Sequence, residues 1–139
     1  VAAPSAADDI ANKGYVDGCH AIVESGSNTN GQWIKFSDGT MIQTKIAATT
    51  NTLSWTLQNT GVGSYGWSFY WARVLNVPYP GGSFVSTPAV FISIKHDTAM
   101  KYITAFDDFV TKDYFGFEVN ADVQRDTMKY NMLAIGRWK

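Results

Sequence analysis

The sequence predicts an all-β fold, an antiparallel β-sandwich of about six to eight strands. Valine and isoleucine together number 20 against 4 leucines, and there are 10 Asp against 2 Glu, so good helix formers are scarce. Short runs of Val, Ile, Phe, Tyr and Thr, bounded by Gly, Pro, Asn or Asp, recur along the chain. Its 139 residues fit one domain, and the composition excludes a helical bundle.

The first 20 residues differ from this pattern. Small residues open the chain, and the segment 6–18 contains Asp8 or Asp9 as an N-cap and glycines that would end a helix after one or two turns. We therefore expect a linker or shaft segment, helical or extended, at residues 1–20 and the sandwich domain at residues 21–139. Because the chain opens at Val1 with a run typical of a linker, we interpret it as a fragment of a longer protein.

Eight strands are expected in the sandwich domain. Asp38-Gly39 is a strong hairpin signal between the second and third strands, and short polar segments join the last four. Each of these connections is expected to join antiparallel neighbours. The strands are expected near residues 21–24, 32–36, 41–47, 70–77, 89–95, 101–109, 114–120 and 128–135.

The connections predict which loops lie together. If every strand runs the length of the sandwich, successive loops alternate between its two ends. One end, which we call the tip, would then carry the loops 25–31, 48–69, 96–100 and 121–127. The opposite end would carry the N-terminal segment and the loops 37–40, 78–88 and 110–113. Long loops in compact domains are usually functional, and 48–69 and 78–88 are both long.

Three stretches of residues carry a family resemblance. IANKGYVDG resembles a linker element that precedes the terminal domains of tailed-phage tail fibres, whereas ESGSNTNGQWIKFSDGTMIQ and MLAIGRWK resemble the first strands and the closing strand of a C-terminal domain common in such fibres. The pattern is also similar to the H-type lectin domain, an antiparallel sandwich that assembles as a trimer and binds sugars. The resemblance implies a homotrimer at the distal end of a tail fibre on the virion.

The chain departs from the lectin pattern at the residues that hold sugar. Its last hairpin, NADVQRDTMK, lacks the Trp-His pair of the lectins, and its early loop, SGSNTNG, lacks their acidic residue. Lys101 is a loose equivalent of their basic residue. The resemblance therefore implies the lectin fold without the lectins' sugar preference.

The expected tip holds the residue types that bind sugars. Aromatic faces stack on pyranose rings, while amides, carboxylates and guanidinium groups form hydrogen bonds with hydroxyls. For Trp55 and Trp67 a place in the core or in a trimer seam is equally consistent, and Arg125 beside Asp122 and Asp126 also fits a solvated salt-bridge cluster. The candidate receptor-binding residues are Asn28, Asn30, Trp55, Tyr65, Trp67, His96, Asp97, Lys101, Asp122, Gln124, Arg125 and Asp126.

Strand residues are expected to fold the domain. Large apolar side chains within strands form either the core or the seam between chains. The residues expected in these roles are Trp33, Trp71, Phe91, Ile92, Ile94, Phe106, Phe115, Phe117, Val119, Leu133 and Ile135.

Several classes of function are disfavoured. The net charge of -1 speaks against nucleic-acid binding, and the apolar runs are too short to insert into a membrane. A single cysteine, Cys19, closes no internal disulfide, and no Cys/His grouping predicts a metal or other cofactor. Asp107 and Asp108 are adjacent in a strand and point to opposite faces, so they cannot act as a glycosidase pair. We expect no enzyme.

We therefore predict that the domain recognises the surface of a host bacterium during adsorption. The expected partner is a cell-surface glycan, such as lipopolysaccharide or capsule, although an outer-membrane protein would suit exposed aromatic residues equally well. Two other classes stay open: a structural domain that trimerises or caps the fibre, and a depolymerase that cleaves surface polysaccharide.

Overall fold

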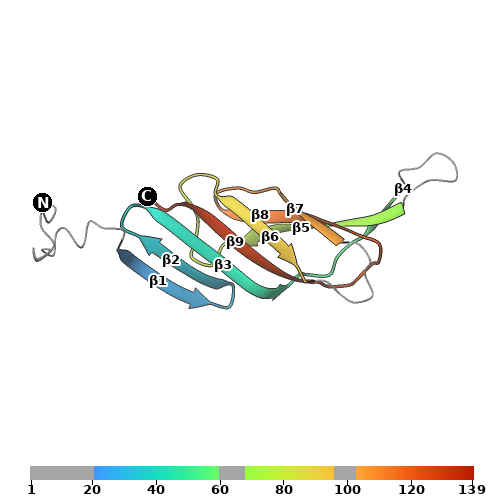
Figure 1. Ribbon diagram of the computed structural model, residues 1–139, viewed down its shortest axis with the longest axis horizontal. Helices are drawn as coiled ribbons and strands as arrows, with labels where there is room; N and C mark the ends of the chain where they lie inside the picture. Colours follow the sequence, from blue (N-terminus) through green and yellow to red (C-terminus); the bar gives the residue numbers. More distant parts are fainter. Residues whose placement is uncertain (1–20, 60–67, 96–102) are drawn as a thin grey trace, which may run out of the picture.

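The computed structural model describes residues 21–59, 68–95 and 103–139, which form nine β-strands and no helix (Figure 1). The expected linker at residues 1–20 lies outside these ranges. The strands are β1 Ile22–Asn28, β2 Gly31–Phe36, β3 Thr40–Thr49, β4 Thr56–Asn59, β5 Ser68–Pro78, β6 Ala89–Ile94, β7 Ile103–Asp108, β8 Tyr114–Ala121 and β9 Lys129–Arg137.

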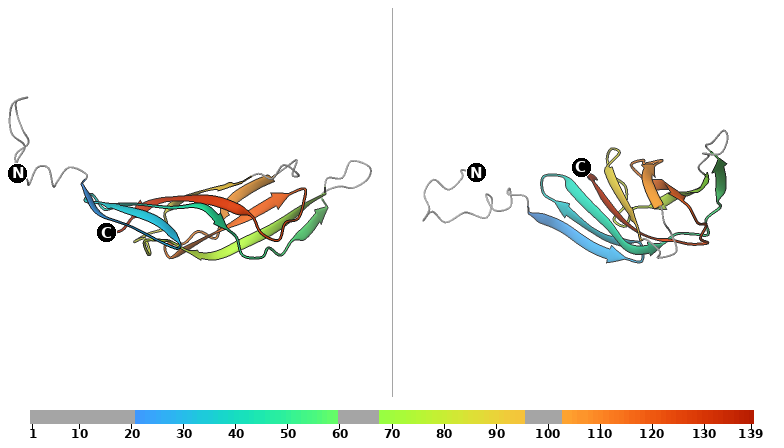
Figure 2. Two further views of the ribbon diagram at one scale, coloured as in Figure 1. Left: turned by 90° about the horizontal axis from the view of Figure 1, so that it is seen from below. Right: turned by 45° about the vertical axis from the view of Figure 1, so that its right-hand side comes forward.

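The strands form two antiparallel sheets. The five-stranded sheet has the order β1-β2-β3-β9-β6, and the four-stranded sheet has the order β4-β5-β8-β7. Figure 2 shows the two sheets as layers of one elongated sandwich. The C-terminus lies near the start of β3, whereas β4 lies at the opposite end of the long axis (Figure 1). The expected all-β sandwich is confirmed, while its assembly as a trimer stays a prediction.

Each of the eight expected strands coincides with a strand of the structure, and β4 is additional. The hairpin signal at Asp38-Gly39 lies between β2 and β3, where the Asp38 Oδ1 atom accepts a hydrogen bond of 2.7 Å from the Thr40 backbone N–H. Gly39 has a φ of 90°, a conformation that glycine adopts at low cost.

The core lies between the sheets and draws on both of them. Phe115, Phe117 and Val119 of β8, all expected core residues, are fully buried against Met41 of β3 and Met132 of β9. Aromatic rings bridge the two layers, with the ring centres of Phe117 and Tyr130 4.9 Å apart. Burial of these large side chains is the main favourable term for the fold.

Three expected core residues are instead exposed on the outer face of the five-stranded sheet. Phe91, Leu133 and Ile135 keep 59%, 36% and 38% of their surface accessible, so of the two roles expected for them, core or chain interface, the core is excluded. The physical reason is that β6 and β9 are apolar on both faces, and smaller or more flexible residues such as Ala134 and Met132 face inward. The alternative of a chain interface stays open for them.

The expected separation of the loops into two ends is also corrected. The 25–31 loop, assigned to the tip, lies beside the 78–88 loop, assigned to the base, because the Asn28 side-chain amide donates a 2.8 Å hydrogen bond to the Pro80 carbonyl. The reason is unequal strand length: the β1–β2 hairpin turns next to Thr44, whereas β3 continues to Thr49.

A buried glutamine side chain, Gln43, helps to fix the 78–88 loop to the five-stranded sheet. Gln43 donates a 2.8 Å hydrogen bond from Nε2 to the Gly82 carbonyl and accepts one of 2.6 Å at Oε1 from the Gly81 N–H. Both ends of this fully buried amide are thus satisfied, as buried polar groups require. Tyr79 adds a hydrogen bond of 3.1 Å from its hydroxyl to the Thr111 carbonyl.

Candidate functional site

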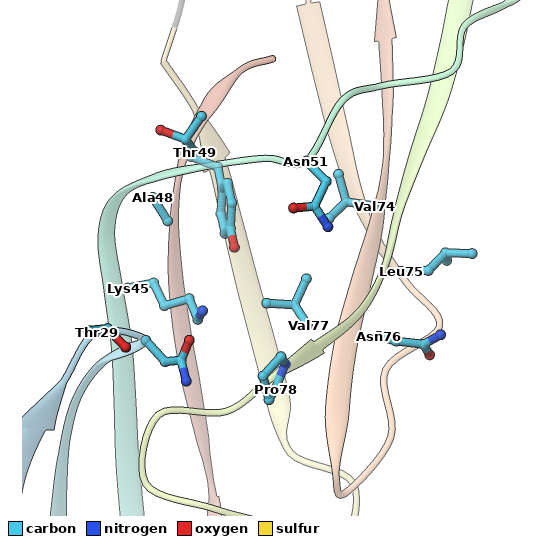
Figure 3. Close-up of a pocket in the computed structure, with 12 residues that line it drawn as sticks. Thr29, Lys45, Ala48, Thr49, Asn51, Val74, Leu75, Asn76, Val77 and Pro78 are labelled. Carbon is cyan, nitrogen blue, oxygen red and sulfur yellow. The ribbon is translucent and has the colours of Figure 1, made fainter. Parts of the chain in front are cut away.

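A polar pocket of about 340 Å³ lies between the edges of the two sheets (Figure 3). One wall comes from the end of β3 and from the β1–β2 turn, and the other from β5. It is lined by Thr29, Asn30, Lys45, Ala48, Thr49, Asn51, Val74, Leu75, Asn76, Val77, Pro78 and Tyr130. We call this the inter-sheet pocket.

Two β-bulges shape the inter-sheet pocket, one in each wall. The register of β3 against β9 shifts between Lys45 and Ala48, and the register of β5 against β8 shifts between Val74 and Val77. Each bulge contains a non-glycine residue with positive φ, Ala47 at 51° in β3 and Asn76 at 56° in β5. Bulges and strained backbone are frequent at functional sites because they re-aim side chains.

Lys45 is the cation of the pocket. Its side chain extends from β3 into the pocket, toward the wall that carries Val77 (Figure 3), yet only 7% of the residue's surface is accessible. Neither a carboxylate nor a hydrogen-bond acceptor contacts its ammonium within the described part of the chain. Burial alone lowers the pKa of Lys45 from its ordinary value.

Tyr130 supplies a second polar atom without a partner. Its ring packs between Phe115 and Phe117, while its hydroxyl forms no hydrogen bond with the residues that the structure describes. Only 3% of the residue is accessible, and burial raises the pKa of the hydroxyl. Within the described residues only the Ser37 Oγ atom is buried without a partner, so the Tyr130 hydroxyl opens to the pocket, where a ligand could engage it.

Amides and hydroxyls complete the lining. Asn30 comes from the β1–β2 turn and Asn51 from the segment after β3, while Val74, Val77 and Pro78 form an apolar side. Figure 3 shows the Asn51 side chain near Val74, and Leu75 and Asn76 on the side remote from Lys45. None of the lining residues is acidic. Chemically, the pocket offers one positive charge, several hydrogen-bonding groups and a small apolar surface.

The structure brings together some of the predicted tip residues at the end of the molecule that carries β4. The Trp55 indole N–H donates a 2.7 Å hydrogen bond to the Arg125 carbonyl, and the Leu53 N–H donates one of 2.8 Å to the Asp126 carbonyl. Trp55 is half-buried and packs against the core. It therefore has a structural role, and its role in binding stays a prediction.

The other described candidates lie in the 122–128 connection or in the β1–β2 hairpin. Asp122 and Arg125 are half-buried in the 122–128 connection, where Gln124 and Asp126 are exposed. Asn30 lines the inter-sheet pocket. Both ends of the Asn28 side-chain amide are already bonded within the fold: Nδ2 donates to the Pro80 carbonyl, and Oδ1 accepts a 2.8 Å hydrogen bond from the Asn30 N–H. Five candidates lie outside the described residues: Tyr65, Trp67, His96, Asp97 and Lys101.

Sequence reasoning missed Lys45, Asn51 and Tyr130. The sequence did contain a signal for Lys45. Strict alternation along β3 puts Met41, Gln43 and Lys45 on one face. If that face points inward, it carries two long polar residues, which is unusual and indicates a special role. The alternation does not say which face is inward, since Ile42 and Ile46 make the other face apolar as well. Tyr130 has no such signal.

Two further hollows flank the five-stranded sheet. One, of about 400 Å³, lies by the β1–β2 turn and is lined mainly by polar residues, including Ser27, Asn28 and Gln32. The other is a shallow apolar depression on the outer face, next to Ile46 and Phe91. Neither is lined by an ammonium group or a tyrosine hydroxyl, so the inter-sheet pocket is the stronger candidate.

No three His, Cys, Asp or Glu side chains cluster as metal ligands would in the segments 21–59, 68–95 and 103–139. Nor do these segments contain a helix with the length and apolar character needed to cross a membrane. Comparison of the chain with models of protein families, with curated proteins and with solved structures gave no significant match.

Proposed function

We propose that this chain is the receptor-binding tip domain of a tailed-phage tail fibre and attaches the virion to a polysaccharide on the host bacterium. The observation that carries the proposal is the inter-sheet pocket, in which amides, a tyrosine hydroxyl and an ammonium group line an open hollow of about 340 Å³. The resemblance of IANKGYVDG and MLAIGRWK to tail-fibre elements supplies the biological setting.

The lining suits a sugar ring better than an apolar ligand. Hydroxyl groups of sugars need paired donors and acceptors, which Asn30, Asn51 and Tyr130 provide. The apolar face of a pyranose needs a small nonpolar surface, which Val77 and Pro78 provide. The volume lies near the lower end of the range of roughly 300–1,000 Å³ that small-molecule sites occupy.

Binding without cleavage is the chemistry that the pocket supports. Hydrolysis of a glycosidic bond requires two carboxyl groups on opposite sides of the bond. The residues that line the inter-sheet pocket include neither Asp nor Glu. The proposal therefore treats the domain as a lectin-like module and not as a depolymerase.

The outer face of the five-stranded sheet supports the proposed homotrimer. Ile34, Phe91, Leu133 and Ile135 lie exposed on it, and the register pairs Phe91 with Leu133 across β6 and β9. Exposed apolar patches of this kind mark interfaces. We propose that two further copies of this chain cover the face. Three linked sites would then bind a repetitive polysaccharide strongly even if each site binds only at about millimolar Kd.

The test is binding of the fluorescently labelled chain to a panel of bacterial strains with defined defects in capsule and lipopolysaccharide. We expect binding to a subset of strains, lost in mutants that lack one surface polysaccharide and inhibited by that polysaccharide in solution. A stable trimer that binds none of the strains would favour a structural cap, and binding lost only with an outer-membrane protein would favour a protein receptor. Release of oligosaccharides from the purified polysaccharide would instead identify a depolymerase.

A further inference from the structure

The inter-sheet pocket holds a positive charge that the fold does not neutralise. A partly desolvated ammonium group is costly unless it is paired. The Lys45 residue keeps only 7% of its surface accessible, its Nζ atom opens to the pocket, and no acidic residue lines that pocket. The contrast with Lys35 is clear, because that ammonium lies 2.9 Å from a carboxylate oxygen of Glu24.

Packing alone does not account for a lysine at this position. A methionine would fill a similar volume at the edge of the core without the desolvation cost, and the chain does place Met41 and Met132 in the same layer. Functional sites commonly retain groups that reduce stability.

We propose that the inter-sheet pocket binds an anionic sugar, a saccharide whose carboxylate or phosphate oxygen pairs with the Nζ atom of Lys45. This inference rests on the proposed function and narrows it to acidic polysaccharides. The two anions share the same chemistry toward Lys45, since each offers oxygens that accept charge-assisted hydrogen bonds.

The neighbouring groups fit the remainder of such a sugar. The hydroxyl of Tyr130 and the amides of Asn30 and Asn51 line the same pocket and can bond to ring hydroxyls. Burial lowers the pKa of Lys45, and no charged group in the described part of the chain counters this shift. An oxyanion in the pocket would stabilise the charged form.

The experiment compares three sugars by isothermal titration calorimetry with the full 139-residue chain. Glucuronate carries a carboxylate, glucose 6-phosphate carries a phosphate, and glucose carries neither. We expect at least one of the two anionic sugars to bind about tenfold or more tightly than glucose, the size typical of a hydrogen bond to a charged group. Which of them binds more tightly distinguishes the carboxylate from the phosphate source.

Two variants make the test specific. Lys45→Met is expected to remove the preference for anionic sugars, whereas Lys129→Met, which removes the same charge from an exposed position of β9, is expected to retain it. Thermal unfolding of both variants checks their folding, and Lys45→Met is expected to be at least as stable as the parent chain. A marked loss of stability in Lys45→Met would contradict the inference, because it would assign the lysine to the fold.

The remaining outcomes separate the inference from the proposed function. Equal affinity for all three sugars, or a preference that survives in Lys45→Met, would overturn the anionic specificity and leave a glycan pocket in place. If none of the three sugars binds to the parent chain, both the anionic specificity and the glycan pocket are contradicted.

Discussion

At the residue scale, two inward-facing polar residues of β3 differ in whether the fold satisfies them. Gln43 is fully buried, and both ends of its amide bond to the backbone of Gly81 and Gly82. Lys45, two residues further along the same face, has no such partner in the described chain. Gln43 therefore holds a loop in place, and we propose that Lys45 serves ligand binding instead.

Tyr130→Phe separates packing from binding in the inter-sheet pocket. The variant keeps the ring against Phe117, whose centre lies 4.9 Å away, and removes a hydroxyl that bonds to no described residue. We expect the free energy of unfolding to change by less than about 0.5 kcal/mol, whereas sugar affinity falls several-fold, the worth of about one hydrogen bond. Chemical denaturation measures the free energy of unfolding, and calorimetric titration measures the sugar affinity. A large loss of stability with unchanged affinity would assign the hydroxyl to the fold.

Tyr79 predicts how stability depends on alkaline pH. Burial raises its pKa to about 12 from an ordinary value of about 10. The folded chain thus holds a proton that the unfolded chain releases, so the stabilisation is complete below about pH 10 and is lost as pH rises toward 12. Because pH 11 lies midway between these two pKa values, about half of the full effect is expressed there, and we expect a loss of about 1.4 kcal/mol between neutral pH and about pH 11, measured by denaturant unfolding.

Tyr79→Phe is the control for this pH dependence. The variant loses the hydrogen bond to the Thr111 carbonyl, so it starts about 1 kcal/mol less stable at neutral pH. Its further loss at alkaline pH should be smaller than that of the parent chain, with the remainder due to Tyr130, whose pKa burial also raises. Identical pH profiles for the two proteins would rule out Tyr79 as the titrating group.

At the element scale, sequence patterns located the strands well where apolar residues cluster. β5, β8 and β9 are rich in β-branched and aromatic residues, and their expected and observed ranges nearly coincide. β1 was expected at 21–24 but runs to Asn28, because the polar stretch Ser25–Asn28 reads as a loop although it pairs with β2 along a sheet edge. β4 was missed because its four residues, TLQN, carry no alternation and owe their strand conformation to pairing with β5.

The inter-sheet pocket was less predictable from the sequence than the strands. The inter-sheet pocket depends on two bulges, and a bulge is an irregularity of pairing between distant strands that leaves little trace in the sequence. Asn76 tolerates a positive φ better than most residues and offers a faint signal, but Ala47 offers none. The 78–88 connection was correctly predicted to be long, whereas the predicted 48–69 loop is interrupted by β4, which pairs with β5.

Ala47→Gly tests the strain in the β3 bulge. Ala47 has a φ of 51°, a conformation that costs a residue with a Cβ atom roughly 1–2 kcal/mol and glycine almost nothing. We expect Ala47→Gly to raise the free energy of unfolding by up to about 1 kcal/mol after the extra entropy of the unfolded glycine is subtracted. Denaturant unfolding of the parent chain and of the variant measures this difference in the free energy of unfolding.

Ala48→Gly is the matched control for this substitution. Ala48 is the next residue, pairs with Tyr130 in the ladder and is half-buried, so the same change there should lower stability by about 0.5–1 kcal/mol. The account of the bulge fails if both glycine variants shift stability in the same direction.

At the scale of the whole molecule, the sandwich has an apolar core on the inside and a second apolar surface on the outside of one sheet. Phe91 is accessible over more than half of its surface, beside its cross-strand neighbour Leu133. A solvent-exposed pairing of this kind favours association. We therefore expect the chain to be a trimer in solution, joined along this face.

A charged pair on the outer face tests the trimer. Phe91→Lys combined with Leu133→Asp places opposite charges at paired positions of β6 and β9. The strand pairing tolerates such a pair, whereas burial in an apolar interface between chains would be costly. Multi-angle light scattering should find a trimer for the parent chain and a monomer for the double variant, with unchanged circular dichroism. Leu57→Asp, at an exposed position of β4, should remain a trimer. A monomeric parent chain would contradict the predicted trimer.

The central claim is that the inter-sheet pocket is where this domain binds a surface polysaccharide. The most direct measurement is an amide-detected NMR titration of the isotope-labelled chain with oligosaccharides from the polysaccharide of a strain that it binds. The account predicts that shifts concentrate at Asn30, Lys45, Asn51, Val77 and Tyr130, which line the pocket. Shifts confined to the loop that carries Asp122 and Arg125, or to the outer face of the five-stranded sheet, would contradict it.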